Sequence, residues 1–340
     1  MNLLLNAFLM MFIGLTLNAK TLNDIDGKTV TLPDQTDRVF GSSPPMNYLL
    51  YTLNPDKMIG LNFKAKNGNN SADEIFLSKK FLSLPLIGSF HGGGQNINLE
   101  TLMAYKPQLV LVWQDDMLVQ TVAKEIEKTK IPSFMIPFRE ISDMPRAFRL
   151  AGNAIGESKR GEVLASYSQK IISEVHKNVS KTKPIRYYYA EGIDGLSSEC
   201  DKSFHVEAMN FAGGENVHKC QQSGILGLEK ISFETLLNYN PEVIIVQNRS
   251  VYNDLISDPM WQNLRAVKTG RIHLVPVQPF NWIDRPPSFM RVIGIQWLAH
   301  LFHPKEYKVN LPQRTKEFYD LFLHVKLNDQ QTKNLLGANQ

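Results

Sequence analysis

The sequence predicts an α/β fold with two Rossmann-like α/β lobes joined by one long α-helix, because one stretch of the chain occurs twice. Residues 98–114, NLETLMAYKPQLVLVWQ, align without gaps with residues 232–248, SFETLLNYNPEVIIVQN. In each copy a capping Asn or Ser starts a short helix, and a Tyr-x-Pro sequence ends it. The apolar run that follows is typical of a strand buried on both faces in a parallel sheet. One such unit in each half of the chain indicates two similar lobes.

The second observation is a long helical pattern between the two copies. Apolar residues recur at helical spacing from Phe148 onward, and Gly156 and Gly161 mark the place for a kink. The chain length, 340 residues, suits two domains of ordinary size. We therefore expect three segments after the first nineteen residues: an N-terminal lobe at 20–142, a connecting long helix at 143–180 and a C-terminal lobe at 181–340.

The first nineteen residues, MNLLLNAFLMMFIGLTLNA, predict a signal peptide. The apolar run from Leu3 to Leu17 has the length of a signal-peptide core and is short for a membrane span. Ala19 offers a small residue at the cleavage point, so we expect the mature chain to begin near Lys20. The run is not preceded by Lys or Arg, which leaves an uncleaved anchor as the alternative. We expect the protein in the periplasm, exported through this signal peptide.

Short strands and helices are expected in each lobe. In the N-terminal lobe, Asp26-Gly27 indicates a hairpin within 22–32. The other elements expected in this lobe, besides the repeat, are a strand from Arg38, a helix at 46–53, strands at 57–62 and 133–136, and a helix at 117–128. In the C-terminal lobe, the expected elements are strands at 185–190 and 271–275, and helices near 205–213, at 289–302 and at 312–326.

The composition is that of a globular protein, with 43% hydrophobic and 21% charged residues. The formal net charge of +4 is small and the basic residues are dispersed, so no nucleic-acid partner is expected. Cys200 and Cys220 are the only cysteines. In an exported protein, such a pair is more typical of a disulfide than of a metal site or a nucleophile.

Motifs of common exported enzymes are missing from the sequence. The chain has no G-x-S-x-G, no H-E-x-x-H and no glycine-rich nucleotide loop. We therefore do not expect an enzyme. An exported enzyme and a structural adhesin are the alternatives from other classes.

Several motifs, in a fixed order along the chain, resemble those of one known family. They are Asp26-Gly27 through Pro33 and Arg38-Val39, the first repeat copy, Phe211-Ala212-Gly213-Gly214-Glu215-Asn216-Val217, the second copy, and Trp261 through Ile272. The sequence resembles the periplasmic substrate-binding proteins of ABC importers for ferric siderophores, cobalamin, haem and related metal chelates. This resemblance covers nearly all of the mature chain. It implies two lobes joined by a long helix, with the ligand held between them.

The resemblance also implies a partner, the inner-membrane ABC permease. Proteins of this family dock through one surface glutamate on each lobe, and by position these residues are Glu100 and Glu234. Both lie in the matched repeat. The alternative is that each carboxylate only complements the positive N-terminal end of its helix.

A glycine-rich loop, FHGGGQ at 90–95, precedes the first repeat copy. Glycines let a backbone approach a ligand closely, and imidazole is a common ligand of transition metals. We therefore take His91 as a candidate metal ligand and Gln95 as a candidate contact. One histidine cannot build a closed metal site, so the metal would arrive bound to its own chelator. The alternative is a solvated loop histidine.

Aromatic and basic residues at strand ends and loops are further candidates for the ligand site. The aromatic candidates are Trp113, Tyr187, Tyr189, Phe280 and Trp282, which could wall a ligand or could simply pack in the core. Arg249 and Arg285 are candidate anion clamps, because a guanidinium pairs bidentately with carboxylates and oxyanions. A surface salt bridge is the alternative for each arginine.

Together these patterns predict a monomeric carrier that transforms nothing and holds no permanent cofactor. We expect it to capture a chelated transition metal, either iron on a siderophore or nickel or cobalt on a small chelator, and to deliver it to the permease. Haem or cobalamin is the alternative within the same fold. An oxyanion held by the arginines is a less favoured one.

Overall fold

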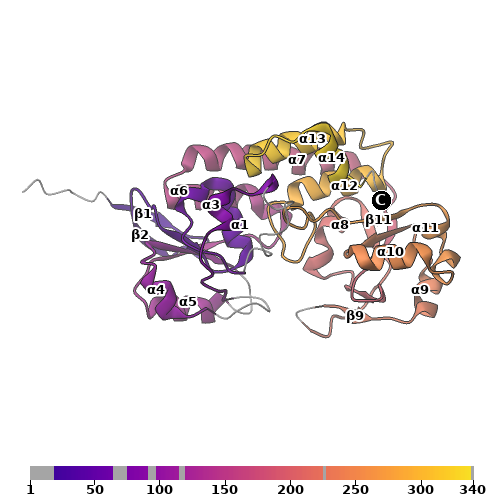
Figure 1. Cartoon of the computed structure of the whole chain (residues 1–340), viewed down its shortest axis with the longest axis horizontal. Helices are drawn as coiled ribbons and strands as arrows, with labels where there is room; N and C mark the ends of the chain where they lie inside the picture. Colours follow the sequence, from indigo (N-terminus) through magenta and orange to yellow (C-terminus); the bar gives the residue numbers. More distant parts are fainter. Residues whose placement is uncertain (1–18, 64–74, 91–96, 115–118, 225–226, 338–340) are drawn as a thin grey trace, which may run out of the picture.

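Two α/β lobes lie side by side and are joined along one edge by helices (Figure 1). The computed structural model describes residues 19–63, 75–90, 97–114, 119–224 and 227–337. The two lobes and the helical bridge confirm the predicted fold class. None of the helices within these ranges is long and apolar enough to cross a membrane.

The N-terminal lobe is built on a parallel sheet of order β3-β4-β5, comprising β3 (Val39–Gly41), β4 (Leu109–Trp113) and β5 (Ser133–Ile136). Every residue of these strands is buried, as the apolar runs in the sequence predict. A separate antiparallel hairpin pairs β1 (Ala19–Asn23) with β2 (Thr29–Pro33), as expected from Asp26-Gly27. The strand expected at 57–62 is reduced to isolated bridges, from Met58 to Val39 and from Leu61 to Leu86.

Short helices cover this sheet. They are α1 (Pro44–Leu53), the 3-10 turn η1 (Pro55–Lys57), α3 (Lys79–Leu82), α4 (Leu99–Ala104) and α5 (Val119–Glu127). Proline occupies the first turn of α1, where its missing N–H costs nothing. The repeat helix α4 begins as predicted, because the Asn98 side chain accepts a hydrogen bond from the backbone N–H of Thr101 at 3.1 Å.

The C-terminal lobe repeats this plan with a parallel sheet of order β11-β10-β6-β8. Its strands are β6 (Ile185–Ala190), β8 (Gly214–Asn216), β10 (Val243–Val246) and β11 (Ile272–Leu274). A second small sheet pairs β7 (Ser197–Ser198) with β9 (Glu229–Lys230). The helices are η3 (Phe204–Val206), α8 (Glu207–Phe211), α9 (Phe233–Tyr239), α10 (Arg249–Ser257), η4 (Trp261–Asn263), α11 (Arg265–Lys268) and α12 (Arg291–Phe302).

The helical stretch expected at 143–180 consists of two helices, α6 (Met144–Ile155) and α7 (Ser158–Val179), after the 3-10 turn η2 (Ile141–Asp143). Gly156 ends α6 with a positive φ of 80°, a conformation that glycine adopts without strain. Gly161 lets the two helices pack closely, because a Cβ there would lie 2.5 Å from the Phe148 carbonyl oxygen. The expectation of one long helix therefore holds for α7 alone.

Helix α7 connects the lobes. Near its start, Arg160 Nε donates a hydrogen bond to the Thr52 carbonyl of the N-terminal lobe at 3.1 Å. Near its end, the His176 ring lies 6.3 Å from the Phe211 ring of the C-terminal lobe. Helix α7 therefore contacts both lobes.

The C-terminal segment returns to the N-terminal lobe. It contains α13 (Leu311–Phe318), the π-helical turn η5 (Tyr319–Leu323) and α14 (Asp329–Leu335), which lie along the upper edge in Figure 1. The Tyr319 ring lies 5.7 Å from the Phe76 ring, and the Phe322 ring lies 5.7 Å from the Phe148 ring. This segment therefore packs into a core that residues of both lobes share.

Candidate ligand-binding cleft

A cavity of about 380 Å³ lies between the lobes. One wall comes from α1, one from the residues that follow β10, and one from the loop before α12. The lining residues are Tyr48, Gln247, Asn248, Arg249, Val277, Pro279, Phe280, Asn281, Arg285 and Pro286. The carboxyl end of β10 thus faces the cavity, as predicted from the behaviour of open α/β sheets.

Tyr48 and Phe280 form an aromatic pair that joins the lobes at this cavity. Their ring centroids are 3.8 Å apart and the rings are tilted by 23°. Burial raises the pKa of Tyr48 to about 12, so its phenol is neutral at physiological pH. Phe280 was a sequence candidate, whereas Tyr48 was not. The signal for Tyr48 was its place on α1, which follows β3, because ligands bind beyond the carboxyl ends of parallel strands.

Arg249 is the cleft cation whose charge is available to a ligand. It is exposed, begins α10 and follows the carboxyl end of β10 after Gln247 and Asn248. Its side chain makes no hydrogen bond or ion pair with any residue that the structure describes. It also lines a smaller neighbouring cavity of about 160 Å³, which reaches Asn334 of α14. Arg249, an anion-clamp candidate from the sequence, therefore lies in the cavity wall with an exposed side chain.

Arg285 also lines the cleft, but its guanidinium is already engaged. Its Nε donates to Glu191 at 2.6 Å, and its Nη2 bonds Glu199. Both carboxylates are fully buried. Arg285 itself adopts a φ of 55°, in the left-handed region that non-glycine residues rarely occupy. The expectation of a clamp that is free to take an anion is therefore corrected, because two internal carboxylates share this charge.

A cluster of buried acidic residues contacts Arg285, and no sequence pattern predicted it. It comprises Glu191, Glu199 and Asp284, and Asp284 Oδ2 lies 2.5 Å from His205 Nδ1. Burial raises the pKa of Glu191 to about 8, because loss of solvation outweighs the attraction of Arg285. The only signal was that Glu191 follows a predicted strand directly. Its partners come from segments far apart in the chain, which no local pattern reveals.

Most of the aromatic residues predicted to form the cleft wall are core residues. Tyr187 is fully buried, stacks 5.8 Å from Phe302 and donates its hydroxyl to Asn210 at 2.7 Å. Trp282 is fully buried and donates Nε1–H to the Tyr319 hydroxyl at 3.2 Å. Among the described cavities, neither side chain forms part of a wall. The alternative weighed in the sequence, ordinary core packing, accounts for both.

Trp113 and Tyr189 are likewise buried at the ends of their strands. Trp113 is the last residue of β4 and packs in the shared core. The Tyr189 hydroxyl is buried near the acidic group, without a hydrogen-bond partner among the described residues. His91 and Gln95, the two candidates in the glycine-rich loop, lie outside the described residues.

Glu100 and Glu234 occupy matching positions on the two lobes. Glu100 is exposed in the first turn of α4, and Glu234 is exposed in the first turn of α9. Helices α4 and α9 lie on opposite lobes along the same lower edge of the molecule (Figure 1). The backbone cap of each helix is supplied by another residue, Asn98 or Ser232, with hydrogen bonds of 3.1 Å. Neither glutamate pairs with a basic residue within the described ranges.

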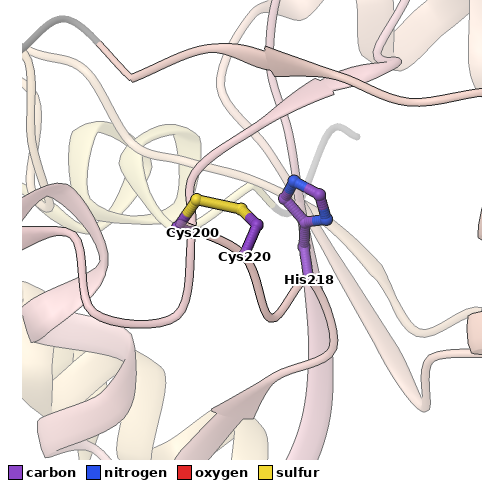
Figure 2. Close-up of side chains that lie close together, drawn as sticks. All are labelled: Cys200, His218 and Cys220. Atoms are coloured by element: carbon purple, nitrogen blue, oxygen red, sulfur yellow. A yellow bond between two sulfur atoms is a disulfide. The ribbon is translucent and has the colours of Figure 1, made fainter. Parts of the chain in front are cut away.

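The predicted disulfide is confirmed. Cys200 and Cys220 are bonded, with their Cα atoms 5.0 Å apart, and the bond closes the loop that carries η3, α8 and β8. His218 lies beside it, as Figure 2 shows.

Two lobes with parallel sheets, a connecting helix and a ligand-sized cavity at a strand end define a small-molecule binding protein. Residues 91–279, more than half of the chain, match the family model described as periplasmic binding protein. The chain therefore belongs to this family, the class III solute-binding proteins of ABC transporters. Members of the family bind solutes and are not enzymes.

Known relatives support this assignment. An ABC transporter solute binding protein from Sulfurospirillum deleyianum superposes with a TM-score of 0.88 at 37% identity, over 93% of this chain and 98% of that one. The molybdate-binding protein MolA of Haemophilus influenzae is 24% identical, over 89% of this chain and 90% of its own. Helicobacter pylori CeuE in a Ni–His complex shares the fold, with a TM-score of 0.65 at 15% identity over 93% of this chain and 99% of that one.

Proposed function

We propose that this protein captures a small anionic complex of a transition metal in the periplasm and delivers it to an inner-membrane ABC permease. The observation that supports an anionic ligand is Arg249, an exposed guanidinium at the carboxyl end of β10 that no described residue neutralises. A guanidinium forms strong paired hydrogen bonds with carboxylate or oxyanion oxygens. The amides of Gln247, Asn248 and Asn281 add hydrogen-bonding groups around it.

The size and the walls of the cavity support a small complex. A volume of about 380 Å³ lies near the lower end of the usual range for ligand sites, roughly 300–1,000 Å³. This favours a metal held by a compact chelator over cobalamin or haem. The Tyr48–Phe280 pair supplies an apolar surface beside the polar groups, which suits the organic part of a chelate.

His91 is the proposed link to the metal itself. Its imidazole would complete the coordination of an ion whose chelator leaves one position open, and imidazole suits nickel or cobalt better than hard iron(III). The cargo is then a transported substrate, not a resident cofactor. Arg249 would bind the negative charge of the chelator, and His91 would bind the ion.

A bare oxyanion is the second candidate. The similarity to MolA, named for molybdate, extends along most of both chains. The exposed Arg249 at the first turn of α10 also suits a tetrahedral oxyanion, because helix N-termini attract negative charge. In this case the aromatic pair would close the cavity without contacting the ligand.

Delivery is proposed to use the two exposed glutamates. Glu100 belongs to the first turn of α4 and Glu234 to the first turn of α9. These two helices lie along one edge of the molecule, one on each lobe, where a two-subunit permease could contact both (Figure 1). We further propose that the carrier works as a monomer, with its N-terminal segment removed as a signal peptide.

The test begins with the natural cargo. Native mass spectrometry and elemental analysis of protein isolated from its own periplasm should detect a transition metal with a small acidic chelator. Thermal unfolding with ferric citrate, with Ni²⁺ plus histidine, with molybdate and with cobalamin then compares the classes. A ligand at about 100 times its Kd stabilises the folded state by roughly 2.7 kcal/mol. Stabilisation by molybdate alone would favour the second candidate, and stabilisation by cobalamin alone would overturn both.

A further inference from the structure

Three side chains in the C-terminal lobe form a cluster of metal-ligand type, and none of the three lines the described cavities. One ligand atom from each of Cys200, His218 and Cys220 lies within 4.8 Å of the other two. Cys200 follows β7, whereas His218 and Cys220 follow β8, so the ends of two strands bring the three together (Figure 2). The chain spacing alone predicts the disulfide and does not reveal the histidine.

The orientation of His218 matches that of a metal ligand. Its side chain is only 7% exposed, and its Nδ1 lies 3.1 Å from the Tyr239 hydroxyl of α9. Its Nε2 is buried and has no hydrogen-bond partner among the described residues. In Figure 2 the imidazole ring lies beside the two sulfur atoms. A proton on Nδ1, donated to Tyr239, leaves the Nε2 lone pair free to bind a metal.

In the oxidised protein the sulfur atoms are bonded to each other, and a thiolate is the form of cysteine that binds metals. We propose that reduction of the Cys200–Cys220 bond opens a metal site. In it, Cys200 Sγ, Cys220 Sγ and His218 Nε2 bind one Zn²⁺ or a similar borderline-soft divalent ion. Two thiolates and one imidazole favour such ions over magnesium or calcium. A water molecule would complete a tetrahedral site.

The conversion balances with a dithiol as the reductant. The dithiol transfers two electrons and two protons to the S–S bond, which breaks into two thiols, and the dithiol is oxidised to a disulfide. The two cysteine thiols then release two protons as Zn²⁺ binds their sulfur atoms. The same pair of residues thus closes the loop covalently when oxidised and through the metal when reduced.

Closing this loop affects the contact between the lobes. The loop carries α8, whose Glu207 accepts hydrogen bonds from Arg291 Nη1 and from the backbone N–H of Ile141, each at 2.8 Å. Arg291 in turn donates to the carbonyl of Phe138 at 3.1 Å. Phe138 and Ile141 both lie just before α6, the first helix of the bridge. A metal ion bound by the two cysteines and His218 would keep this contact between the lobes in place after the disulfide is reduced.

The test compares the same mature protein in two redox states. Protein is reduced with a phosphine, which takes up one oxygen from water as two thiols form, and is then desalted without oxygen. We expect reduction to add one tightly bound Zn²⁺ per chain over the oxidised protein, as measured by elemental analysis and competition with a chromogenic chelator. Cobalt substitution should give a thiolate-to-metal absorption band in the reduced protein only. Equal metal content in both states, or no thiolate band, would overturn the proposal.

Substitutions assign the ligands. His218→Gln and Tyr239→Phe should each lower the zinc affinity of the reduced protein by about tenfold or more, the second because it removes the group that orients the imidazole. His176→Gln, an exposed histidine on α7, is the matched control and should leave the affinity unchanged. Because Cys220→Ser would also remove the disulfide, its folding is checked by circular dichroism, and the histidine variants keep the test independent of that outcome. An unchanged affinity in both His218→Gln and Tyr239→Phe would rule out the proposed ligand set.

Discussion

Tyr48 and Phe280 stack across the boundary between the lobes, with ring centroids 3.8 Å apart, and both line the cleft. The stack joins α1 of the N-terminal lobe to the loop before α12 in the C-terminal lobe. The two rings therefore connect the lobes and also form an apolar wall of the cleft. A double-mutant cycle measures how much their direct interaction stabilises the fold.

Replacing both rings by leucine should reveal their direct interaction. We expect Tyr48→Leu and Phe280→Leu each to lower the free energy of unfolding, with a coupling energy of about 0.5–1.5 kcal/mol between them. Denaturant unfolding of the parent, the two single variants and the double variant measures this coupling. Additive losses would show that the stack contributes nothing beyond burial. Tyr48→Phe serves as the control, because it keeps the ring and removes only the hydroxyl.

Arg249→Gln should weaken the binding of an anionic ligand with little effect on folding. A hydrogen bond to a charged group contributes roughly 1.5–3 kcal/mol, so the Kd should rise roughly ten- to hundredfold. Arg249 is exposed and pairs with no described residue, so the free energy of unfolding should change by no more than about 0.5 kcal/mol. Titration calorimetry with the cargo identified from the periplasm measures the affinity.

The matched control for Arg249 is Arg265→Gln. Arg265 is also exposed in the C-terminal lobe, on α11, but it does not line the cavity. Equal losses of affinity in the two variants would mean that only the overall charge of the lobe matters. In that case the cleft assignment of Arg249 would be wrong.

Local patterns explain which parts of the fold the sequence could predict. The two repeat copies became α4–β4 and α9–β10, because capping, proline and apolar runs act over a few residues. The disulfide was predictable from export and from an even cysteine count. The break at Gly156 was placed correctly, but its sharpness depends on the close packing of Gly161 against Phe148.

The site was harder to predict, because its charges meet only in three dimensions. The sequence predicts Arg285 as an anion clamp, yet Glu191 and Glu199, which precede it by 94 and 86 positions, bind its guanidinium. The sequence predicts Trp282 as part of the cleft wall, yet Tyr319 of η5, in the C-terminal segment, packs against it and accepts its hydrogen bond. Composition cannot distinguish a cleft aromatic from a core aromatic when the covering segment is distant in the chain.

The buried carboxyl of Glu191 should make stability depend on pH. Its pKa is raised from the ordinary 4.5 to about 8 in the folded protein, mainly by burial. Between these two values the folded state holds a proton that the unfolded state has lost, so rising pH lowers the free energy of unfolding. The stabilisation is complete below about pH 4.5 and is lost as the pH rises through about 8.

Glu191→Gln isolates this contribution, because the amide has a similar size and does not titrate. Denaturant unfolding of the parent and the variant is compared from pH 5 to pH 9. We expect the stability of the parent to decline relative to that of the variant as the pH rises. A constant difference between the two proteins would show that Glu191 stays ionised beside Arg285 and that the ion pair prevails over desolvation.

The last prediction concerns Glu100 and Glu234, which are exposed on matching helices of the two lobes. If they dock onto basic residues of a permease, Glu100→Lys or Glu234→Lys places like charges in contact. Such contacts cost several kcal/mol, so uptake of the cargo by cells that express the natural permease should fall about tenfold or more. Affinity for the cargo should not change, because neither side chain lines the described cavities. Glu306→Lys, an exposed acid after α12, is the control and should preserve uptake. Circular dichroism and cargo titration of each variant separate docking from folding, because a parallel loss of affinity would assign the glutamates to the fold.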